Sequence, residues 1–153
     1  WRSERRHGQR AANRRFAISG AESAKVVKPG QTYVGAQGFT YGAGVSRETV
    51  GETSICMNVL PMPPGAKARS HYHKGIDTIA YLIDGRCSVY FGDRLEHRLQ
   101  AEAGDHVFMP RDVPHAPVND SGAPCTWIVV HSSGSDQDDI VLTPDLDRVL
   151  PVF

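Results

Sequence analysis

Residues 65–85 read GAKARSHYHKGIDTIAYLIDG, and this stretch places two histidines, His71 and His73, one residue apart. Glycines at its two ends, Gly65 and Gly85, mark turns, and the run TIAYLI has the β-branched and aliphatic composition that favours a strand. Successive side chains of a strand point to opposite faces, so the two imidazoles are expected on the same face. Imidazoles placed in this way are able to share one metal ion, although an H-x-H pair taken alone is a weak signal.

Short β-prone runs closed by Gly, Pro or Asp recur along the chain from about residue 24. They include ETSICMNVLPMPPG at 52–65, HRLQAEAGDHVFMPRD at 97–112 and CTWIVVHSSG at 125–134. No stretch shows a convincing helical period, so the pattern predicts an all-β sandwich or barrel. Within it, LIDGRCSVYFGDR at 82–94 predicts a hairpin whose turn is Asp84-Gly85.

Length and composition describe one folded domain with balanced charge. The 153 residues are enough for a single domain with a real core, and 17 Lys plus Arg residues balance 17 Asp plus Glu residues. This neutrality gives no reason to expect nucleic-acid binding, and no apolar run is long enough to cross a bilayer. Cys56, Cys87 and Cys125 match no paired-ligand spacing, and we interpret them as reduced thiols of a cytoplasmic protein.

The chain is predicted to divide into a tail and a domain. Residues 1–23 begin with an arginine-rich run, which predicts a basic segment that is flexible or packs on a partner subunit, and residues 24–153 are predicted to form a single barrel domain. The run TIAYLI at 78–83 has apolar or neutral side chains on both faces, so neither face suits water. One face would line the interior and the other would be covered by a second sheet or subunit, which predicts a homodimer.

A second motif lies downstream of the histidine pair, in GDHVFMPRDVPHAPVN at 104–119. Its anchor residues are Gly104, Pro110, Asp112, His115 and Asn119. Together the two stretches resemble the signature motifs of the cupin superfamily, G-x5-H-x-H-x4-E-x6-G and G-x5-P-x-G-x2-H-x3-N, over roughly residues 50–132. Asp112 stands where the second motif has glycine, and aspartate tolerates a left-handed turn conformation better than most residues.

The cupin resemblance implies an all-β jelly-roll barrel, or double-stranded β-helix, with a metal ion inside it. The metal ligands that it implies are His71, His73 and His115. The family's usual fourth ligand, a glutamate, corresponds to Thr78 at the longer of two spacings and to Asp77 at the shorter. Threonine is a poor ligand for such metals, whereas Asp77 has suitable chemistry but a shorter reach, and it would need a one-residue shift such as a bulge. The alternatives for this position are Asp77, which we favour, Thr78 and water.

A closer likeness is carried by GFTYGAGVS at 38–46 and DIVLTPDLDRVL at 139–150. These stretches are similar to a group of small single-domain bacterial cupins that includes zinc-containing aromatic polyketide cyclases. That group typically has His-Glu-Thr after the second motif histidine, whereas this chain has Ile76-Asp77-Thr78. A cyclase that used the extra histidine as a ligand would find only Ile76 in its place.

Two hypotheses for function follow from the barrel motifs, and a third, a regulatory or interaction protein that uses the arginine-rich start, ranks last because the barrel motifs explain more of the chain. The first is a metalloenzyme of isomerase, cyclase or dioxygenase type, which holds one divalent Zn, Fe, Mn or Ni ion and acts on a small carbonyl- or enol-containing substrate. The second is a non-catalytic small-molecule-binding cupin whose metal is structural or absent. The sequence identifies no catalytic side chain. His131, at the end of CTWIVVH, either faces the cavity or caps a strand edge, and we favour the second interpretation.

Overall fold

The structure is a computed structural model that describes residues 24–152. The predicted basic segment 1–23 lies outside the described residues, as does residue 153. In chain order the described elements are β1 (Thr32–Val34), β2 (Thr40–Val45), α1 (Arg47–Val50), β3 (Cys56–Met62), β4 (His71–His73), β5 (Thr78–Asp84), β6 (Arg86–Phe91), β7 (His97–Glu102), β8 (His106–Met109), β9 (His115–Val118), β10 (Cys125–His131), β11 (Ile140–Leu142) and the 3-10 helix η1 (Pro144–Val149).

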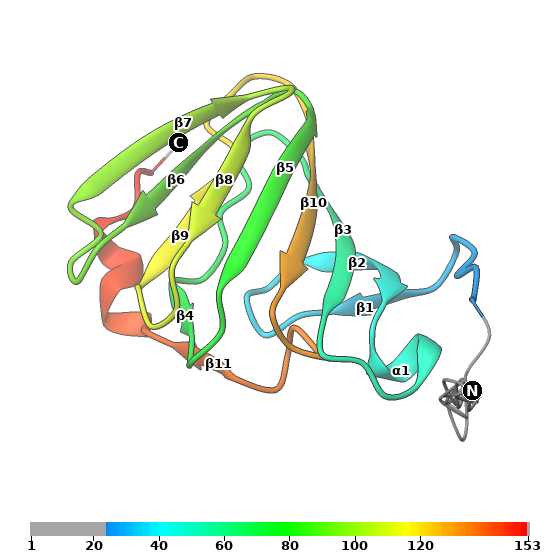
Figure 1. Cartoon of the computed structure of the whole chain (residues 1–153). Helices are drawn as coiled ribbons and strands as arrows, with labels where there is room; N and C mark the ends of the chain where they lie inside the picture. Colours follow the sequence, from blue (N-terminus) through cyan, green and yellow to red (C-terminus); the bar gives the residue numbers. More distant parts are fainter. Residues whose placement is uncertain (1–23, 153) are drawn as a thin grey trace, which may run out of the picture.

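The strands form two antiparallel sheets that enclose the interior of a barrel (Figure 1). Sheet A has the order β1-β2-β3-β10-β5-β8, and sheet B has the order β11-β4-β9-β6-β7. Neighbouring strands are often distant in sequence, as in the pairing of β10 with both β3 and β5. The predicted all-β jelly-roll architecture is confirmed.

The core is built by alternation along the strands. In β3 every second residue from Cys56 to Met62 is buried, and the residues between them are exposed. A period of two is what a sheet with one face on the core requires. The largest cluster of buried residues joins the inner faces of both sheets and consists of Tyr41, Leu60, Met62, Leu82, Cys87, Val89, Ala101, Met109, Cys125 and Trp127.

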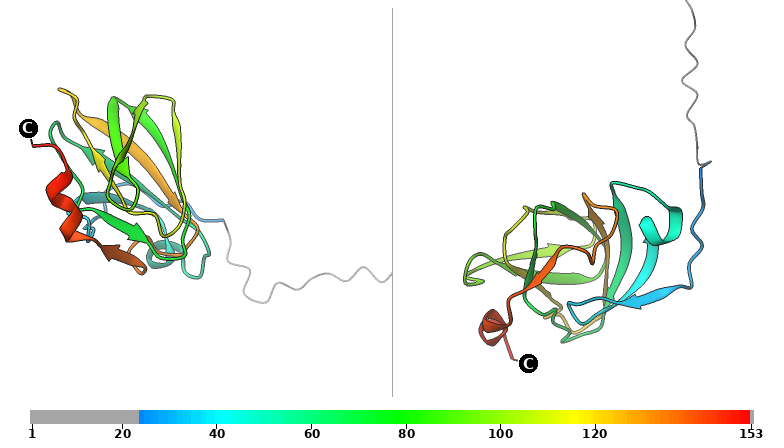
Figure 2. Two further views of the ribbon diagram at one scale, coloured as in Figure 1. Left: turned by 90° about the vertical axis from the view of Figure 1, so that its left-hand side faces the viewer. Right: turned by 90° about the horizontal axis from the view of Figure 1, so that it is seen from below.

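Helical structure within residues 24–152 is limited to α1 and η1. Figure 2 shows η1, in red, beside the barrel, where Leu150 at its end packs with Leu95, Ala116 and Val118. Neither helix combines the length and the hydrophobicity that a membrane-spanning helix needs.

The predicted hairpin with its turn at Asp84-Gly85 is wrong. β5 belongs to sheet A and β6 to sheet B, so Gly85 is a corner at which the chain passes from one sheet to the other. Its φ of 81° lies in the left-handed region, and a Cβ atom there would lie 2.5 Å from the carbonyl oxygen of Pro124. The hairpin of this region is formed by β6 and β7 instead. A tight hairpin and a corner both favour glycine, so the residue type could not distinguish them.

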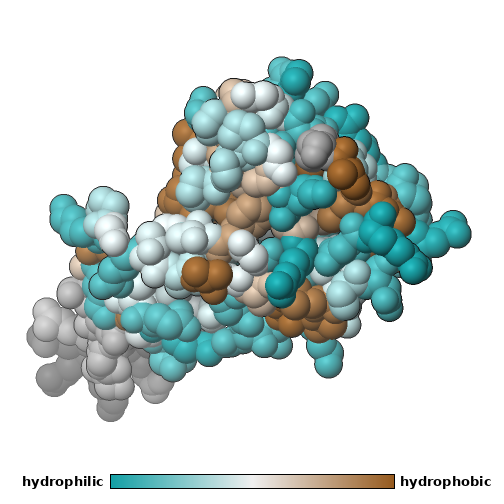
Figure 3. Space-filling model, turned by 180° about the vertical axis from the view of Figure 1, so that it is seen from behind, coloured by the Kyte–Doolittle hydropathy of each residue, from teal (hydrophilic) through white to brown (hydrophobic). Residues whose placement is uncertain are grey.

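The outer face of sheet A is apolar although it is exposed. Ile79 of β5 and Phe108 of β8 are cross-strand partners with exposed fractions of 51% and 60%. The strand register extends this surface over β3, β10, β5 and β8 in two rows. We call its members the outer apolar patch: Met57, Val130, Ile79 and Phe108 in one row, and Val59, Ile128 and Tyr81 in the other. On the side of the molecule shown in Figure 3, by contrast, hydrophobic residues form separate brown groups between teal hydrophilic ones.

Candidate metal centre

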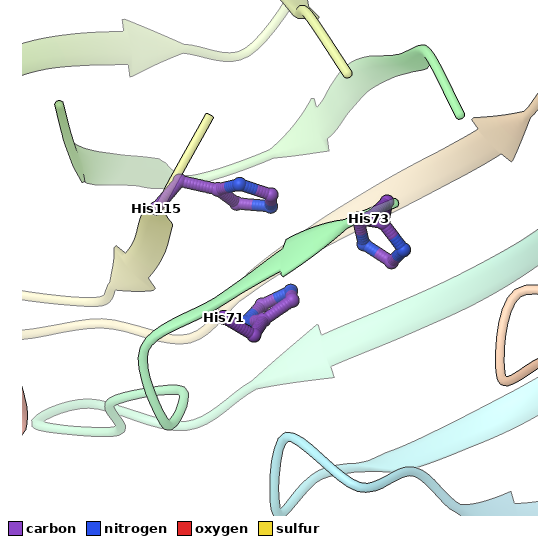
Figure 4. A group of neighbouring side chains, drawn as sticks. All are labelled: His71, His73 and His115. Carbon is purple, nitrogen blue, oxygen red and sulfur yellow. The ribbon is translucent and has the colours of Figure 1, made fainter. Parts of the chain in front are cut away.

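Three histidines from two neighbouring strands of sheet B converge inside the barrel (Figure 4). His71 and His73 are the first and last residues of β4, and both are buried while Tyr72 between them is half-buried. His115 begins β9 and stands opposite His71 in the register of the two strands. The potential ligand nitrogens of the three residues lie within 4.8 Å of one another. Strand alternation thus places two imidazoles on one side, and the adjacent strand supplies the third.

Backbone carbonyl groups fix the orientation of two of the rings. Nδ1 of His71 is 2.8 Å from the carbonyl oxygen of Arg69, and Nδ1 of His115 is 2.9 Å from that of Val113. A carbonyl oxygen only accepts, so Nδ1 carries the proton in both rings and Nε2 keeps a free lone pair. Nδ1 of His73 is buried and has no hydrogen-bond partner among the described residues, so one nitrogen of the group stays unsatisfied.

Burial keeps these imidazoles neutral. Desolvation lowers the pKa of His71 well below its usual value, and the neighbouring His115 adds to the shift. The pKa of His73 is lowered by desolvation and then by His131, and desolvation also lowers the pKa of His115. Neutral imidazole is the metal-binding form, so no proton has to leave before a cation binds at neutral pH.

Asp77, the tentative fourth ligand, does not lie with the histidines. Its carboxylate forms a bidentate ion pair with Arg111, with Oδ2 at 2.6 Å from Nη2 and Oδ1 at 3.1 Å from Nε. The hydrogen bonds from Arg111 lower the pKa of Asp77. Neighbouring residues of an extended chain point to opposite sides, and because Thr78 faces inward, Asp77 faces outward. Asp77 thus pairs with Arg111 and lies apart from the three histidines, and its place in the ligand set stays a prediction.

His131 is a cavity residue that the sequence reasoning placed at a strand edge. It is buried, its ring centroid lies 4.5 Å from that of His73, and its Nδ1 is 2.9 Å from Oγ1 of Thr78. Desolvation lowers the pKa of His131 to about 4. The signal was present in β10, because Trp127 and Val129 precede His131 at a period of two and line the same cavity.

The histidines share this cavity with mostly apolar walls. Its volume is about 70 Å³, several times the roughly 10–15 Å³ that a single water molecule needs. Both sheets contribute to it, with Leu60 and Trp127 from sheet A and Val89 and Pro117 from sheet B. Among the described residues that line it there is no Asp, Glu, Lys or Arg.

Comparison with known proteins gives one family match. Residues 58–131 match the family model described as Cupin domain. None of the curated proteins compared matches the sequence.

Several solved structures are similar. The DMSP lyase DddQ from Ruegeria pomeroyi DSS-3 is 26% identical, with a TM-score of 0.51 over 60% of this chain and 44% of that one. A sugar phosphate isomerase from a cupin superfamily, from Silicibacter pomeroyi DSS-3, is 23% identical, with a TM-score of 0.52 over 67% of this chain and 75% of that one. The oxalate decarboxylase of Lactobacillus farciminis, in a formate complex, is 15% identical, with a TM-score of 0.60 over 82% of this chain and 36% of that one. The last two likenesses show a shared fold, and this chain spans less than half the length of the lyase and of the decarboxylase.

Proposed function

Because this chain belongs to the cupin superfamily and brings His71, His73 and His115 together inside its barrel, we propose that it is a metal-binding cupin and acts as a metalloenzyme on a small carbonyl- or enol-containing organic substrate. The observation that carries the proposal is the convergence of three buried, neutral imidazoles in a cavity. Burying three imidazoles side by side is unfavourable unless something satisfies their ring nitrogens.

The donor set fits a divalent transition metal. The carbonyl groups of Arg69 and Val113 hold the rings of His71 and His115 in the tautomer that a metal requires. Nδ1 of His73 is buried without a hydrogen-bond partner among the described residues, which supports a site that a further group completes. A divalent ion held by these residues supplies Lewis acidity toward a substrate oxygen. Three protein ligands leave further positions for water or substrate, as catalytic metal sites do.

No carboxylate of the described residues lies with the three histidines, and this narrows the choice of metal ion. Imidazole donors suit zinc, iron and nickel, whereas a carboxylate donor suits manganese. Within residues 24–152 the group that converges contains histidines alone, and Asp77 is engaged by Arg111. We therefore propose one bound Zn, Fe or Ni ion, with Mn the least suited of the four metals considered.

The reaction type is proposed as isomerisation, cyclisation or dioxygenation. The similar structures carry the names of a lyase, an isomerase and a decarboxylase, which supports small organic substrates and selects no single reaction. Ile76 is buried and apolar, so a cyclase of this fold would have to work here without an additional histidine ligand at that position.

The alternative is a non-catalytic cupin that binds a small molecule. The uncharged cavity favours it, because the described lining residues include no carboxylate or amine and, beside the three proposed ligands, leave only His131 and Tyr41 as groups able to transfer protons. A ligand that binds and is recovered unchanged would support this alternative, and turnover would support the enzyme.

Metal analysis of single variants tests the proposal. His71→Ala and His115→Ala, each loaded with Zn²⁺ and dialysed, should lose most of the metal that the unmodified chain retains at about one ion per chain, because three ligands become two. His97→Ala is the matched control, since His97 lies on the exposed surface of β7. Unchanged metal content in His115→Ala would contradict the proposed centre.

We further propose that the protein is a homodimer joined through the outer apolar patch. One row of the patch spans four strands, about 15 Å at the usual strand spacing of about 4.8 Å, and the other ends at Tyr81, which faces His106 of β8. The members of the patch are uncharged, so they would not match an acidic or basic partner. A two-fold axis would bring the same patch of both subunits together, as in most homodimers. Exposed Ile55 and Ile83 extend the apolar surface toward the roughly 800 Å² per partner of a standard interface.

The cytoplasm is the proposed location. Cys56, Cys87 and Cys125 are all buried and free, as is usual for proteins of a reducing compartment.

A further inference from the structure

Thr78 and His131 form a second polar element of the cavity, apart from the three proposed ligands. Thr78 begins β5, His131 ends β10, and the two are partners in the strand register. Both side chains are buried, and the hydrogen bond between Oγ1 and Nδ1 holds the imidazole in one plane. This bond occupies Nδ1, and no described residue hydrogen-bonds to Nε2 of His131. His131 lines the cavity, so this ring nitrogen is free to hydrogen-bond to water or to a ligand there.

The position of His131 places that nitrogen beside the metal centre. Its ring centroid lies 4.5 Å from that of His73, and both residues line the same cavity. His131 does not belong to the set whose ligand nitrogens lie within 4.8 Å of one another. A molecule bound to an ion at the three ligands would therefore have His131 beside it.

The other residues that line the cavity restrict which chemical groups such a molecule has. Leu60, Val89, Val107 and Met109 are among the lining residues, and none of the described lining residues is charged. A phosphate group, or a carboxylate that does not reach the proposed ion, would lose its water here without gaining a cationic side chain. Such a transfer is unfavourable. An uncharged apolar body meets no such penalty and gains free energy from burial.

We propose that the cavity takes a small uncharged molecule with an apolar or aromatic body and two neighbouring oxygen atoms, an enol or a hydroxyketone, and that His131, held by Thr78, hydrogen-bonds to it and positions it. The inference rests on the proposed function, because the oxygen atoms bind at the ion held by His71, His73 and His115.

Maltol, a ring hydroxyketone that is uncharged in solution and releases its hydroxyl proton to the buffer when it chelates a divalent ion, is a suitable probe with the full chain loaded with Co²⁺, whose visible absorption reports on its ligands. Maltol should change the cobalt spectrum and bind more tightly than oxalate or glycerol 3-phosphate. His131→Ala should weaken maltol binding roughly three- to tenfold, the range expected for one hydrogen bond, with cobalt content unchanged. Thr78→Val keeps the imidazole but frees it to rotate, so it should weaken maltol in the same direction by a smaller factor. His97→Ala serves as the control and should change neither quantity.

The outcomes separate this inference from the proposed function. If the unmodified protein binds no cobalt, the proposed function fails and the inference fails with it. If cobalt binds and both His131→Ala and Thr78→Val bind maltol as the unmodified protein does, only the inference is overturned. Loss of cobalt in His131→Ala would make His131 a ligand and overturn its positioning role. Tighter binding of oxalate or glycerol 3-phosphate would overturn the uncharged substrate class.

Discussion

The two faces of sheet A contrast sharply in what surrounds them. β5 and β10 carry apolar side chains on both sides, but the inner side packs against sheet B and the outer side is exposed. On the inner side, the polar residues Thr78 and His131 interrupt an apolar wall. On the outer side, apolar residues cover a surface open to water. A buried polar group and an exposed apolar patch are the two informative exceptions to ordinary burial, and here they lie on opposite faces of the same strands.

The largest expected effect is a difference in the free energy of unfolding between substitutions at two adjacent residues of β5, one on each face of sheet A. Leu82 is fully buried and Ile83 has an exposed fraction of 46%. Leu82→Ala should lower the free energy of unfolding by about 2–5 kcal/mol, because it removes buried surface and leaves a cavity. Ile83→Ala should lower it by less than about 1 kcal/mol. Urea unfolding of both variants at low protein concentration measures the difference.

Equal losses in these two variants would contradict the contrast as stated. They would mean that Ile83 is as well packed as Leu82 during the measurement. Repeating the unfolding at higher protein concentration then tells whether a second chain provides that packing, since only a dimer makes stability depend on concentration.

A charge placed in the outer apolar patch tests the exposed face of sheet A, and its expected effect, on dimerisation, is smaller. Ile79→Lys should weaken dimerisation by about 2 kcal/mol, roughly 30-fold in the dissociation constant, because the lysine must be buried in the interface. Sedimentation equilibrium measures this constant. Gln100→Lys, on the exposed surface of β7 in sheet B, is the matched control and should leave it unchanged.

The metal content of Ile79→Lys should equal that of the unmodified protein, because its side chain points away from the cavity. An unmodified protein that is monomeric at micromolar concentration would refute the homodimer, and the patch would then need another explanation.

The sequence predicted those features that depend on local spacing. The period of two in H-x-H was enough to place His71 and His73 on one face, and the two motifs were enough to predict the barrel and His115 beside them. Sequence spacing cannot tell in which sheet a strand lies. For this reason the glycine at position 85 was read as a hairpin turn when it is a corner between sheets.

The fourth position of the site was harder to predict for a related physical reason. Asp77 has metal-binding chemistry, but its direction depends on Thr78 facing inward and on Arg111, more than thirty residues away, which holds its carboxylate outside. For His131 the strand edge was favoured over the cavity because a lone histidine near a strand end is common. Continuing the alternation from the buried Trp127 would have placed it inside.

The smallest expected effect is that of Asp77→Asn. This variant tests whether Asp77 belongs to the outer ion pair with Arg111 or to the metal site. Asp77→Asn should leave metal content unchanged, because the carboxylate pairs with Arg111 rather than with the histidines. Its effect on the melting temperature should be slight at pH 7, since both side chains are partly exposed and such pairs stabilise little. Arg111 holds the pKa of Asp77 below its usual value, so the pair contributes fully above the ordinary carboxyl pKa of about 3.9 and loses its contribution as the pH falls through the lowered value. The melting temperatures of the variant and the unmodified protein should therefore converge in strong acid, whereas a large loss of metal in Asp77→Asn would return this residue to the ligand set.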